Sequence, residues 1–186
     1  MIRGKNIILR LTRRDDLPEI HRLMENLETR GEFWPLGIRS LSKLSQDFDS
    51  DGFWAQDHGF LQITDLDGRL IGNIGFFQGT PGGEWFETGY RIYRPEDRGK
   101  GYMTEALRMF SAYIFTLKHF PRLQLCAHPD NAGSCRVAEK CGFTREGILR
   151  KSFFLHGEWH DTVVYSMLAE EAAAWADVIP DGEVQS

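Results

Sequence analysis

Residues 98–103 form a glycine-containing turn that is suited to binding phosphate. The stretch reads Arg-Gly-Lys-Gly-Tyr-Met and lies between a strand-like run at 85–93 and a helical run that opens at Thr104. Its two glycines allow a sharp turn and a close approach of N–H groups to a ligand, and the helix adds unpaired amides and the positive end of its dipole. Because charge-assisted hydrogen bonds contribute about 1.5–3 kcal/mol each, we expect the backbone to matter more than the Lys100 side chain.

Two common phosphate loops fit these residues poorly. A P-loop needs four residues between its first glycine and Gly-Lys, followed by Ser or Thr, whereas one lysine separates Gly99 from Gly101 and Tyr102 follows. A dinucleotide-binding fingerprint needs a third glycine or alanine where this chain has Thr104. A solvent loop that only caps the helix is the remaining alternative.

A second strand, turn and helix follow the first. Residues 123–127 read as a buried strand, 128–134 as a turn, and 135–141 as a helix that Gly142 closes. The helix predicted over about 104–120 connects the two strands as a parallel pair with a right-handed crossover. Ligands bind at the carboxyl ends of such strands, so this second unit supports the first.

The rest of the chain predicts a mixed sheet with further helices. Strands are expected at 7–11, 59–63, 70–76, 150–156 and 161–168, with turns at Asp67-Gly68 and His156-Gly157. Helices are expected after a Thr12 cap, after Ser40, and at 169–175. The sequence therefore predicts a single domain over 1–175, followed by a loose tail over 176–186.

Together these motifs resemble the GNAT family of acetyl-CoA-dependent N-acetyltransferases, and within it the RimJ/RimL branch. Residues 98–103 resemble the family's pyrophosphate loop, residues 131–143 its second signature, and residues 157–161 its closing hairpin. The resemblance implies an α+β fold: a central, mixed, mostly antiparallel twisted sheet with one parallel strand pair and helices on both faces. Met103 departs from the wider pattern, which has Gly or Ala there, but is similar to the RimJ/RimL branch.

The resemblance also implies which residues bind acetyl-CoA. Backbone groups of the coenzyme strand hold the pantetheine arm, the glycine turn holds the pyrophosphate, and the second signature contributes further contacts. These residues are Tyr90, Arg91, Ile92, Arg98, Gly99, Lys100, Gly101, Tyr102, Met103, Thr104, Asn131 and Ser134. Simple helix initiation is the alternative role for Thr104, and a plain helix N-cap is the alternative for Asn131.

The catalytic residues that the resemblance suggests are Glu87 and Ser134. Glu87 lies where many GNAT enzymes carry a base that acts directly or through water, and Ser134 matches the proton donor for the departing thiolate. Some relatives place another glutamate in the strand after Gly-Phe, but residues 151–154 contain no carboxylate. The bases that stay open are Glu84, His128, His156 and Asp161, and the alternative proton donors are Tyr90, Tyr93 and Tyr102.

The expected reaction is direct transfer of an acetyl group to a primary amine, either a protein N-terminal α-amine or a small-molecule amine, in a ternary complex. A lysine amine titrates near about 10.4 and an α-amine near about 7.7–8.0, so an α-amine needs less help from a base and is favoured here. Acceptor contacts are expected in the segments 53–54, 79–84 and 156–160 and from Phe33, Trp34, Trp85, Glu87 and His128. The alternative function is a non-catalytic acetyl-CoA-binding sensor.

Composition excludes several other classes. The 186 residues carry a formal net charge of −5, which argues against nucleic acid as the main partner. We expect no membrane segment and a cytoplasmic location, with a homodimer as one open alternative for assembly. The three cysteines match no zinc pattern, so we predict buried, reduced thiols, no disulfide and no metal site. The expected partners are acetyl-CoA and an amine.

Overall fold

The computed structural model describes residues 1–28, 30–79 and 84–178. Five α-helices and eight strands of this part are, in chain order, β1 (Ile2–Arg3), β2 (Ile8–Leu11), α1 (Leu17–Glu25), α2 (Leu41–Asp51), β3 (His58–Thr64), β4 (Leu70–Gln78), β5 (Phe86–Ile92), α3 (Tyr102–Leu117), β6 (Arg122–Ala127), α4 (Ala132–Lys140), β7 (Thr144–Leu155), β8 (Glu158–Leu168) and α5 (Trp175–Val178). Three short 3-10 turns join them, at Arg14–Asp16, Pro95–Asp97 and Ala169–Glu171.

All eight strands lie in one sheet, in the order β1-β2-β3-β4-β5-β6-β8-β7. Every neighbouring pair is antiparallel except β5 and β6, which are parallel and are joined through α3. Their pairing runs from Phe86–Leu123 only as far as Thr88–Leu125, although β5 continues to Ile92 and β6 to Ala127. The two strands therefore separate near the middle of the sheet and leave the second half of β5 open toward β6.

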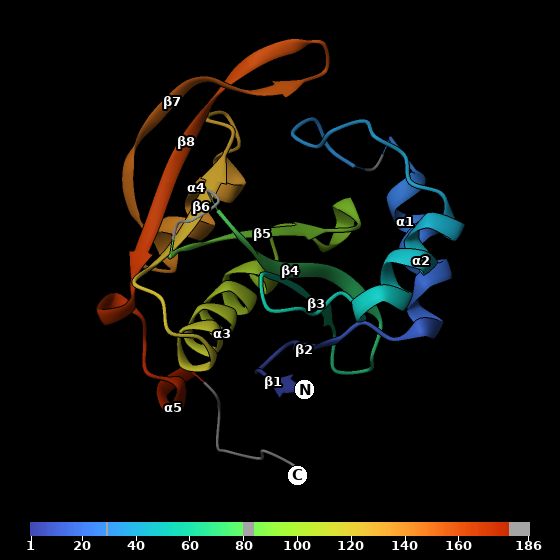
Figure 1. Cartoon of the computed structure of the whole chain (residues 1–186), viewed down its shortest axis with the longest axis horizontal. Coiled ribbons are helices and arrows are strands. Elements are labelled where there is room, and N and C mark those ends of the chain that lie inside the picture. Colours follow the sequence, from blue (N-terminus) through green and yellow to red (C-terminus); the bar gives the residue numbers. More distant parts are fainter. Residues whose placement is uncertain (29, 80–83, 179–186) are drawn as a thin grey trace.

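Helices cover both faces of the sheet, as the sequence predicted (Figure 1). Leu107 and Phe110 of α3 pack on one face with Ile74 and Leu123, and all four side chains are fully buried. On the other face, Leu17 and Ile20 of α1 and Leu44 of α2 form a second core with Leu70 and Tyr93. Because side chains alternate along a strand, the odd-numbered positions of β5, and Tyr93 just after it, face α1, whereas the even-numbered positions face α3.

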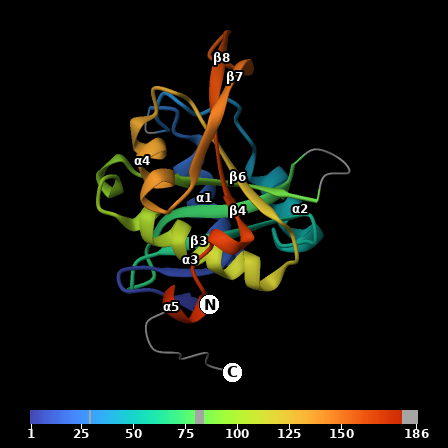
Figure 2. The same ribbon diagram turned by 90° about the vertical axis from the view of Figure 1, so that its left-hand side faces the viewer.

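The strands β7 and β8 form a long ribbon whose tip projects past the rest of the sheet in both views (Figures 1 and 2). The turn between them is at His156-Gly157, where both residues have positive φ, at 51° and 90°. This turn was predicted from the sequence, although β7 begins six residues earlier than expected.

Several predicted element boundaries were wrong. Thr12 is not a helix cap: Arg13 is the N-cap of the 3-10 turn, and the buried Thr12 Oγ1 accepts a hydrogen bond from Gln62 Nε2 at 2.9 Å. The helix expected over 169–175 is a 3-10 turn followed by irregular chain, and α5 begins only at Trp175. Leu117, the last residue of α3, is 48% exposed.

Helix α5 extends the folded domain beyond the predicted boundary at residue 175. The Trp175 ring lies 5.5 Å from the Tyr113 ring of α3, and Val178 also packs against the main core. Residues 179–186 of the predicted loose tail lie outside the described residues, as do residues 80–83 of the segment expected to contact the acceptor. No helix in the described ranges is long and apolar enough to cross a membrane.

Candidate active site

The glycine turn forms the start of α3, next to the open end of β5. Gly99 and Gly101 have φ of 74° and 85°, a conformation that disfavours residues with a Cβ, and Gly101 is the N-cap of the helix. The first N–H of α3 to bond within the helix is that of Glu105, which donates to the Gly101 carbonyl at 3.0 Å. Among the described residues, the N–H groups of residues 99–104 therefore have no partner in the chain.

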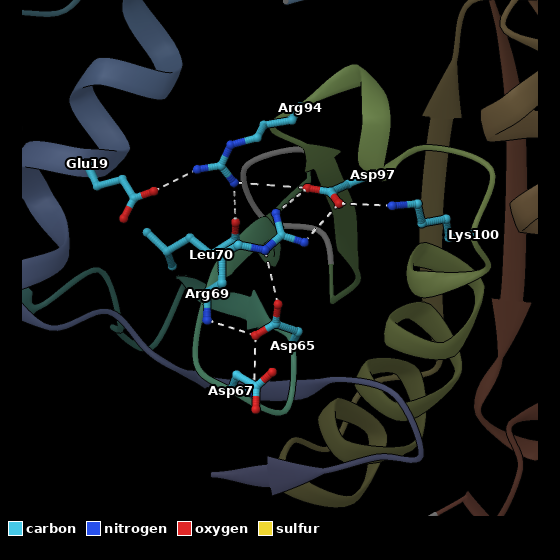
Figure 3. A network of polar contacts seen from close by, with 8 residues as sticks. All are labelled: Glu19, Asp65, Asp67, Arg69, Leu70, Arg94, Asp97 and Lys100. Atoms are coloured by element: carbon cyan, nitrogen blue, oxygen red, sulfur yellow. Dashed lines mark hydrogen bonds and ion pairs between the residues drawn. The ribbon is translucent and has the colours of Figure 1, made fainter.

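A buried carboxylate holds this turn in place (Figure 3). Asp97, with only 1% of its side chain exposed, accepts hydrogen bonds from Arg69 Nη1 and Nη2 at 2.7 and 2.9 Å. Lys100 Nζ lies 3.5 Å from the same carboxylate, and Arg94 links it to Glu19 of α1. The hydrogen bonds from Arg69 keep the pKa of Asp97 below its ordinary value. The sequence analysis missed Asp97, because its main partner lies 28 residues away.

Tyr90 and Ser134 meet on the α3 side of the opening between β5 and β6. Tyr90 Oη lies 2.9 Å from Ser134 Oγ, and either group is able to donate. Burial raises the pKa of Tyr90 above its ordinary value. Asn131 is the N-cap of α4, and its Oδ1 accepts a hydrogen bond from the Ser134 N–H at 3.1 Å. Two of the predicted proton donors thus form one hydrogen-bonded pair, which Asn131 positions.

Glu87 lies on the opposite face of β5. Gln124, its pairing partner on β6, donates a hydrogen bond through Nε2 to Glu87 Oε2 at 3.3 Å. Burial raises the pKa of Glu87, and the hydrogen bond from Gln124 opposes that shift only in part. The thiol of Cys126, which is also close to Glu87, has its pKa raised to about 12, chiefly by burial. The Glu87 carboxylate therefore binds a proton more readily than an ordinary glutamate does, and its described side-chain partners are Gln124 and Cys126.

The segment between α1 and α2 covers the α1 side of the opening. The Phe33 ring packs on His128 of the β6 end at 5.0 Å between centroids, and the Trp34 ring packs on the Arg91 guanidinium at 3.8 Å. The Trp34 carbonyl lies 3.1 Å from Nε2 of His156, at the tip of the β7–β8 ribbon. Four of the residues predicted for the site therefore come together from three distant parts of the chain, and His156 joins them.

His128 also pairs with His160, which the sequence analysis did not single out. His128 Nδ1 accepts a hydrogen bond from the Asp130 N–H at 3.1 Å, so the ring proton of a neutral His128 is on Nε2. His128 Nε2 lies 3.1 Å from His160 Nδ1 and is placed to donate to it. Only the position of His160 in the predicted closing hairpin, within residues 157–161, gave a signal from sequence.

Four other predicted residues make contacts apart from the Tyr90–Ser134 pair and Glu87. The Trp85 ring packs beside Gly79, which follows the end of β4. Met103 is buried in the main core, so only its backbone is available to a ligand. Tyr93 is buried and donates its hydroxyl hydrogen to Gln62 at 2.8 Å. The Asp161 carboxylate accepts a hydrogen bond from the Lys151 N–H at 2.9 Å.

The three cysteines are free thiols in the structure. Cys141 is buried, as predicted, whereas Cys126 and Cys135 are only half-buried, because both lie beside the opening at the β5–β6 pair. In the described part of the chain, no group of three or more His, Cys, Asp and Glu side chains is placed to hold a metal ion.

Partnerless amides at a helix N-terminus, beside the open end of a parallel strand pair, are typical of proteins that bind a phosphate-bearing coenzyme. The chain belongs to the GNAT acetyltransferase family, since a model described as "Acetyltransferase (GNAT) domain" matches residues 6–144. This family uses acetyl-CoA as its acetyl donor. The resemblance stated from the motifs, the RimJ/RimL branch included, is confirmed.

Individual relatives agree with this assignment. The chain is 38% identical over 114 residues to the probable N-acetyltransferase YjcK of Bacillus subtilis, which covers 61% of this chain and 62% of the relative. It is 25% identical to the spermidine N(1)-acetyltransferase of Vibrio cholerae over 85% of this chain and 90% of that one. The solved structure of RimL, a ribosomal L7/L12 α-N-protein acetyltransferase in complex with coenzyme A, has the same fold, with a TM-score of 0.76, 20% identity, and coverage of 89% and 95%. The curated relatives that align at 34–38% identity are matched over 56–62% of their own length.

Proposed function

We propose that this protein transfers an acetyl group from acetyl-CoA to a primary amine in a ternary complex. The observation that carries the proposal is the glycine turn, whose N–H groups lack partners within the described chain and lie beside the open end of β5. Amides and a helix N-terminus bind a diphosphate well, and open backbone groups of β5 suit the amide-rich pantetheine arm. Such a complex requires the cytoplasmic acetyl-CoA pool, so the proposal includes that location.

The two sides of the opening have different roles in the proposed mechanism. The neutral amine enters from the α1 side and attacks the thioester carbon, and its nitrogen then loses a proton to Glu87 directly or through one water. The C–N bond forms as the C–S bond breaks. The thiolate leaves toward the α3 side, where the Tyr90–Ser134 pair supplies its proton. This division is supported by the positions of Glu87 and Tyr90 on opposite faces of one strand.

We propose an α-amine, or another amine of low pKa, as the acceptor. The ammonium form cannot attack, and an α-amine is already partly neutral near pH 8, whereas a lysine side chain is almost entirely protonated. Glu87 is the only carboxylate proposed to act here, because residues 151–154 lack the second one. This chain is similar to one relative named for a polyamine acceptor and to another named for a ribosomal acceptor. An experiment must therefore determine the amine class.

A thiol-release assay with acetyl-CoA and an amine panel tests the proposal. We expect turnover with α-amines across pH 7–9 and slower turnover with lysine side chains. Faster acetylation of lysine side chains would overturn the proposed acceptor class. Acetyl-CoA binding without turnover on any amine would instead support a non-catalytic coenzyme sensor. Glu87→Gln and Ser134→Ala variants, measured in the same assay, test the two assigned roles.

A further inference from the structure

Arg91 is a buried cation without an anionic partner among the described residues. The residue is only 8% exposed, yet within the described part of the chain its guanidinium makes no hydrogen bond or ion pair; its one described interaction is the face-to-ring contact with Trp34 at 3.8 Å. Burial, together with the positive charges of Arg30 and Arg98, lowers the pKa of Arg91 to about 10. An unpaired charge in this position is unfavourable unless a ligand compensates it.

Arg30 and Arg94, two other arginines in this region, have partners within the chain. Arg30 donates to three backbone carbonyls, those of Met24, Pro35 and Gly37, and so holds the segment between α1 and α2. Arg94, three residues further along the chain, pairs with Glu19. Arg91 therefore has its planar N–H edge available, although its face is fixed against Trp34. A guanidinium in this state suits a carboxylate, which accepts two parallel hydrogen bonds.

The position of Arg91 indicates that the carboxylate it would bind belongs to the acceptor. Arg91 and Glu87 are four residues apart on β5, and both side chains face α1, where the amine is proposed to enter. The backbone amides of the coenzyme loop lie on the other face, at the start of α3, whereas the Arg98 side chain of that loop reaches Gly31 in the segment between α1 and α2. A carboxylate bound at Arg91 would therefore lie on the same side of the sheet as the reacting amine.

We infer that the acceptor carries a carboxylate, which Arg91 binds while the amine of the same molecule reaches Glu87. This inference rests on the proposed acetyl transfer and names its substrate class. At about 3.3 Å per residue, the two positions on β5 are roughly 13 Å apart. An extended peptide of three or four residues spans that distance between its α-amine and its C-terminal carboxylate, since each residue adds about 3.3–3.6 Å. A polyamine, which has no anion, leaves Arg91 unpaired.

Alanine peptides of two to five residues, each with a free or an amidated C-terminus, test the inference. The ratio of kcat/KM for acid over amide is expected to be roughly 10–100-fold at three or four residues, as for one buried charge-assisted pair. An amidated peptide with aspartate at its third position distinguishes a side-chain carboxylate from a terminal one. Equal rates for acid and amide at every length, with no gain from the aspartate, would overturn the inference while leaving acetyl transfer intact.

Substitution of Arg91 provides the second test. Arg91→Met keeps a long apolar side chain at this position and removes the charge, so the acid-over-amide ratio should fall to about 1, and Arg91→Lys should restore part of it. The ratio is an internal control, because a general loss of folding lowers both rates equally. Arg22→Met, which removes a mostly exposed charge of α1, should leave the ratio unchanged. A weaker acetyl-CoA affinity in Arg91→Met with an unchanged ratio would assign Arg91 to the coenzyme and overturn the inference.

Calorimetry separates this inference from the proposed function. Binding of the free-acid tetrapeptide to the protein with CoA is measured without turnover. Tighter binding of the acid than of the amide, lost in Arg91→Met, would support the carboxylate site even if no acetylation occurred. Equal binding of both peptides would overturn it.

Discussion

At the scale of single residues, burial determines how readily Glu87 and Tyr90 hold their protons. Both have their pKa raised by desolvation, which makes the Glu87 carboxylate a better proton acceptor and keeps the Tyr90 hydroxyl protonated. The two groups are three positions apart on β5 and point to opposite faces. A base and an acid are thus separated by the space in which the thioester is proposed to lie.

Glu87→Gln should lower kcat/KM by about 100-fold or more near neutral pH, which is typical for loss of a general base. Since the pKa of Glu87 is raised, its basic form is present only above that pKa, and the acid limb of the pH profile should lie above the ordinary glutamate value of 4.5. Initial rates from pH 5 to 9 measure both effects, with the exposed Glu170→Gln as the matched control. A Glu87→Gln variant with the wild-type profile would rule out Glu87 as the base.

Ser134→Ala and Tyr90→Phe should each lower kcat more than they change KM for acetyl-CoA, because both remove the hydrogen-bonded pair that is proposed to protonate the thiolate. The double variant should be no slower than the worse single variant, since groups that act as a unit are not additive. Steady-state kinetics of the three variants measure this. Cys135→Ala, at the adjacent position, should be close to wild type; a large loss there would instead indicate a role for the thiol.

At the scale of elements, the start of α3 depends on support from other parts of the chain. Gly99 and Gly101 adopt a left-handed conformation, and Asp97 below them is tied to Arg69 of the β3–β4 turn and, through Arg94, to α1. The turn is therefore ordered before a ligand arrives, which reduces the entropy lost on binding.

Gly101→Ala should weaken acetyl-CoA binding by roughly 5–30-fold. No atom lies within 4 Å of an added Cβ, so the penalty is the left-handed backbone itself, at about 1–2 kcal/mol. In the variant, the turn relieves this strain by moving away from the left-handed conformation, and acetyl-CoA binding must restore that conformation. Gly52→Ala is the matched control, because Gly52 also has positive φ and free space but caps α2. Calorimetry should show an altered Kd only for Gly101→Ala; equal Kd values would contradict the assigned role of the turn.

Asp97→Asn should destabilise the protein by about 1.5–3 kcal/mol near neutral pH, the usual contribution of hydrogen bonds to a charged group. The folded-state pKa of Asp97 is lowered, so this stabilisation is complete above the ordinary value of 3.8 and disappears as the pH falls through the folded-state pKa. Urea unfolding of wild type and variant from pH 3 to 7 should show the difference shrinking at low pH. Asp67→Asn, an exposed carboxylate in the β3–β4 turn, is the control; a pH-independent difference would contradict the prediction.

At the scale of the whole molecule, one topological feature creates the site. The single parallel pair, β5 and β6, separates after three residue pairs, and the segment between α1 and α2 and the tip of the β7–β8 ribbon meet above the opening through Trp34 and His156. A ligand held there contacts both halves of the sheet, so its binding should stabilise the entire domain.

Acetyl-CoA at about 100 times its Kd should add about 2.7 kcal/mol of stability and raise Tm by roughly 5–10 °C for a domain of this size. Differential scanning fluorimetry with increasing acetyl-CoA measures the shift. The shift should be smaller for Gly101→Ala at the same concentration. A Tm that does not change with saturating acetyl-CoA would contradict coenzyme binding.

The sequence by itself predicted the glycine turn, the parallel pair, most strands and helices, and the family. These features depend on local patterns: glycines at fixed spacing, alternation along strands, and apolar side chains at helical intervals. Local patterns fail where an element is short or its end is set by contacts elsewhere, as at Thr12, whose hydroxyl bonds Gln62 and caps no helix.

Only the tertiary structure decided which side chains meet. The carboxylate beneath the turn, the His128–His160 pair and the Arg91 guanidinium covered by Trp34 each depend on residues brought together from distant parts of the chain. The sequence placed Arg91 in the coenzyme strand but carried no sign that Trp34 would cover its charge. The physical reason is that burial and pairing, which set charge and proton affinity, are properties of neighbours in space, and a sequence specifies directly only its neighbours along the chain.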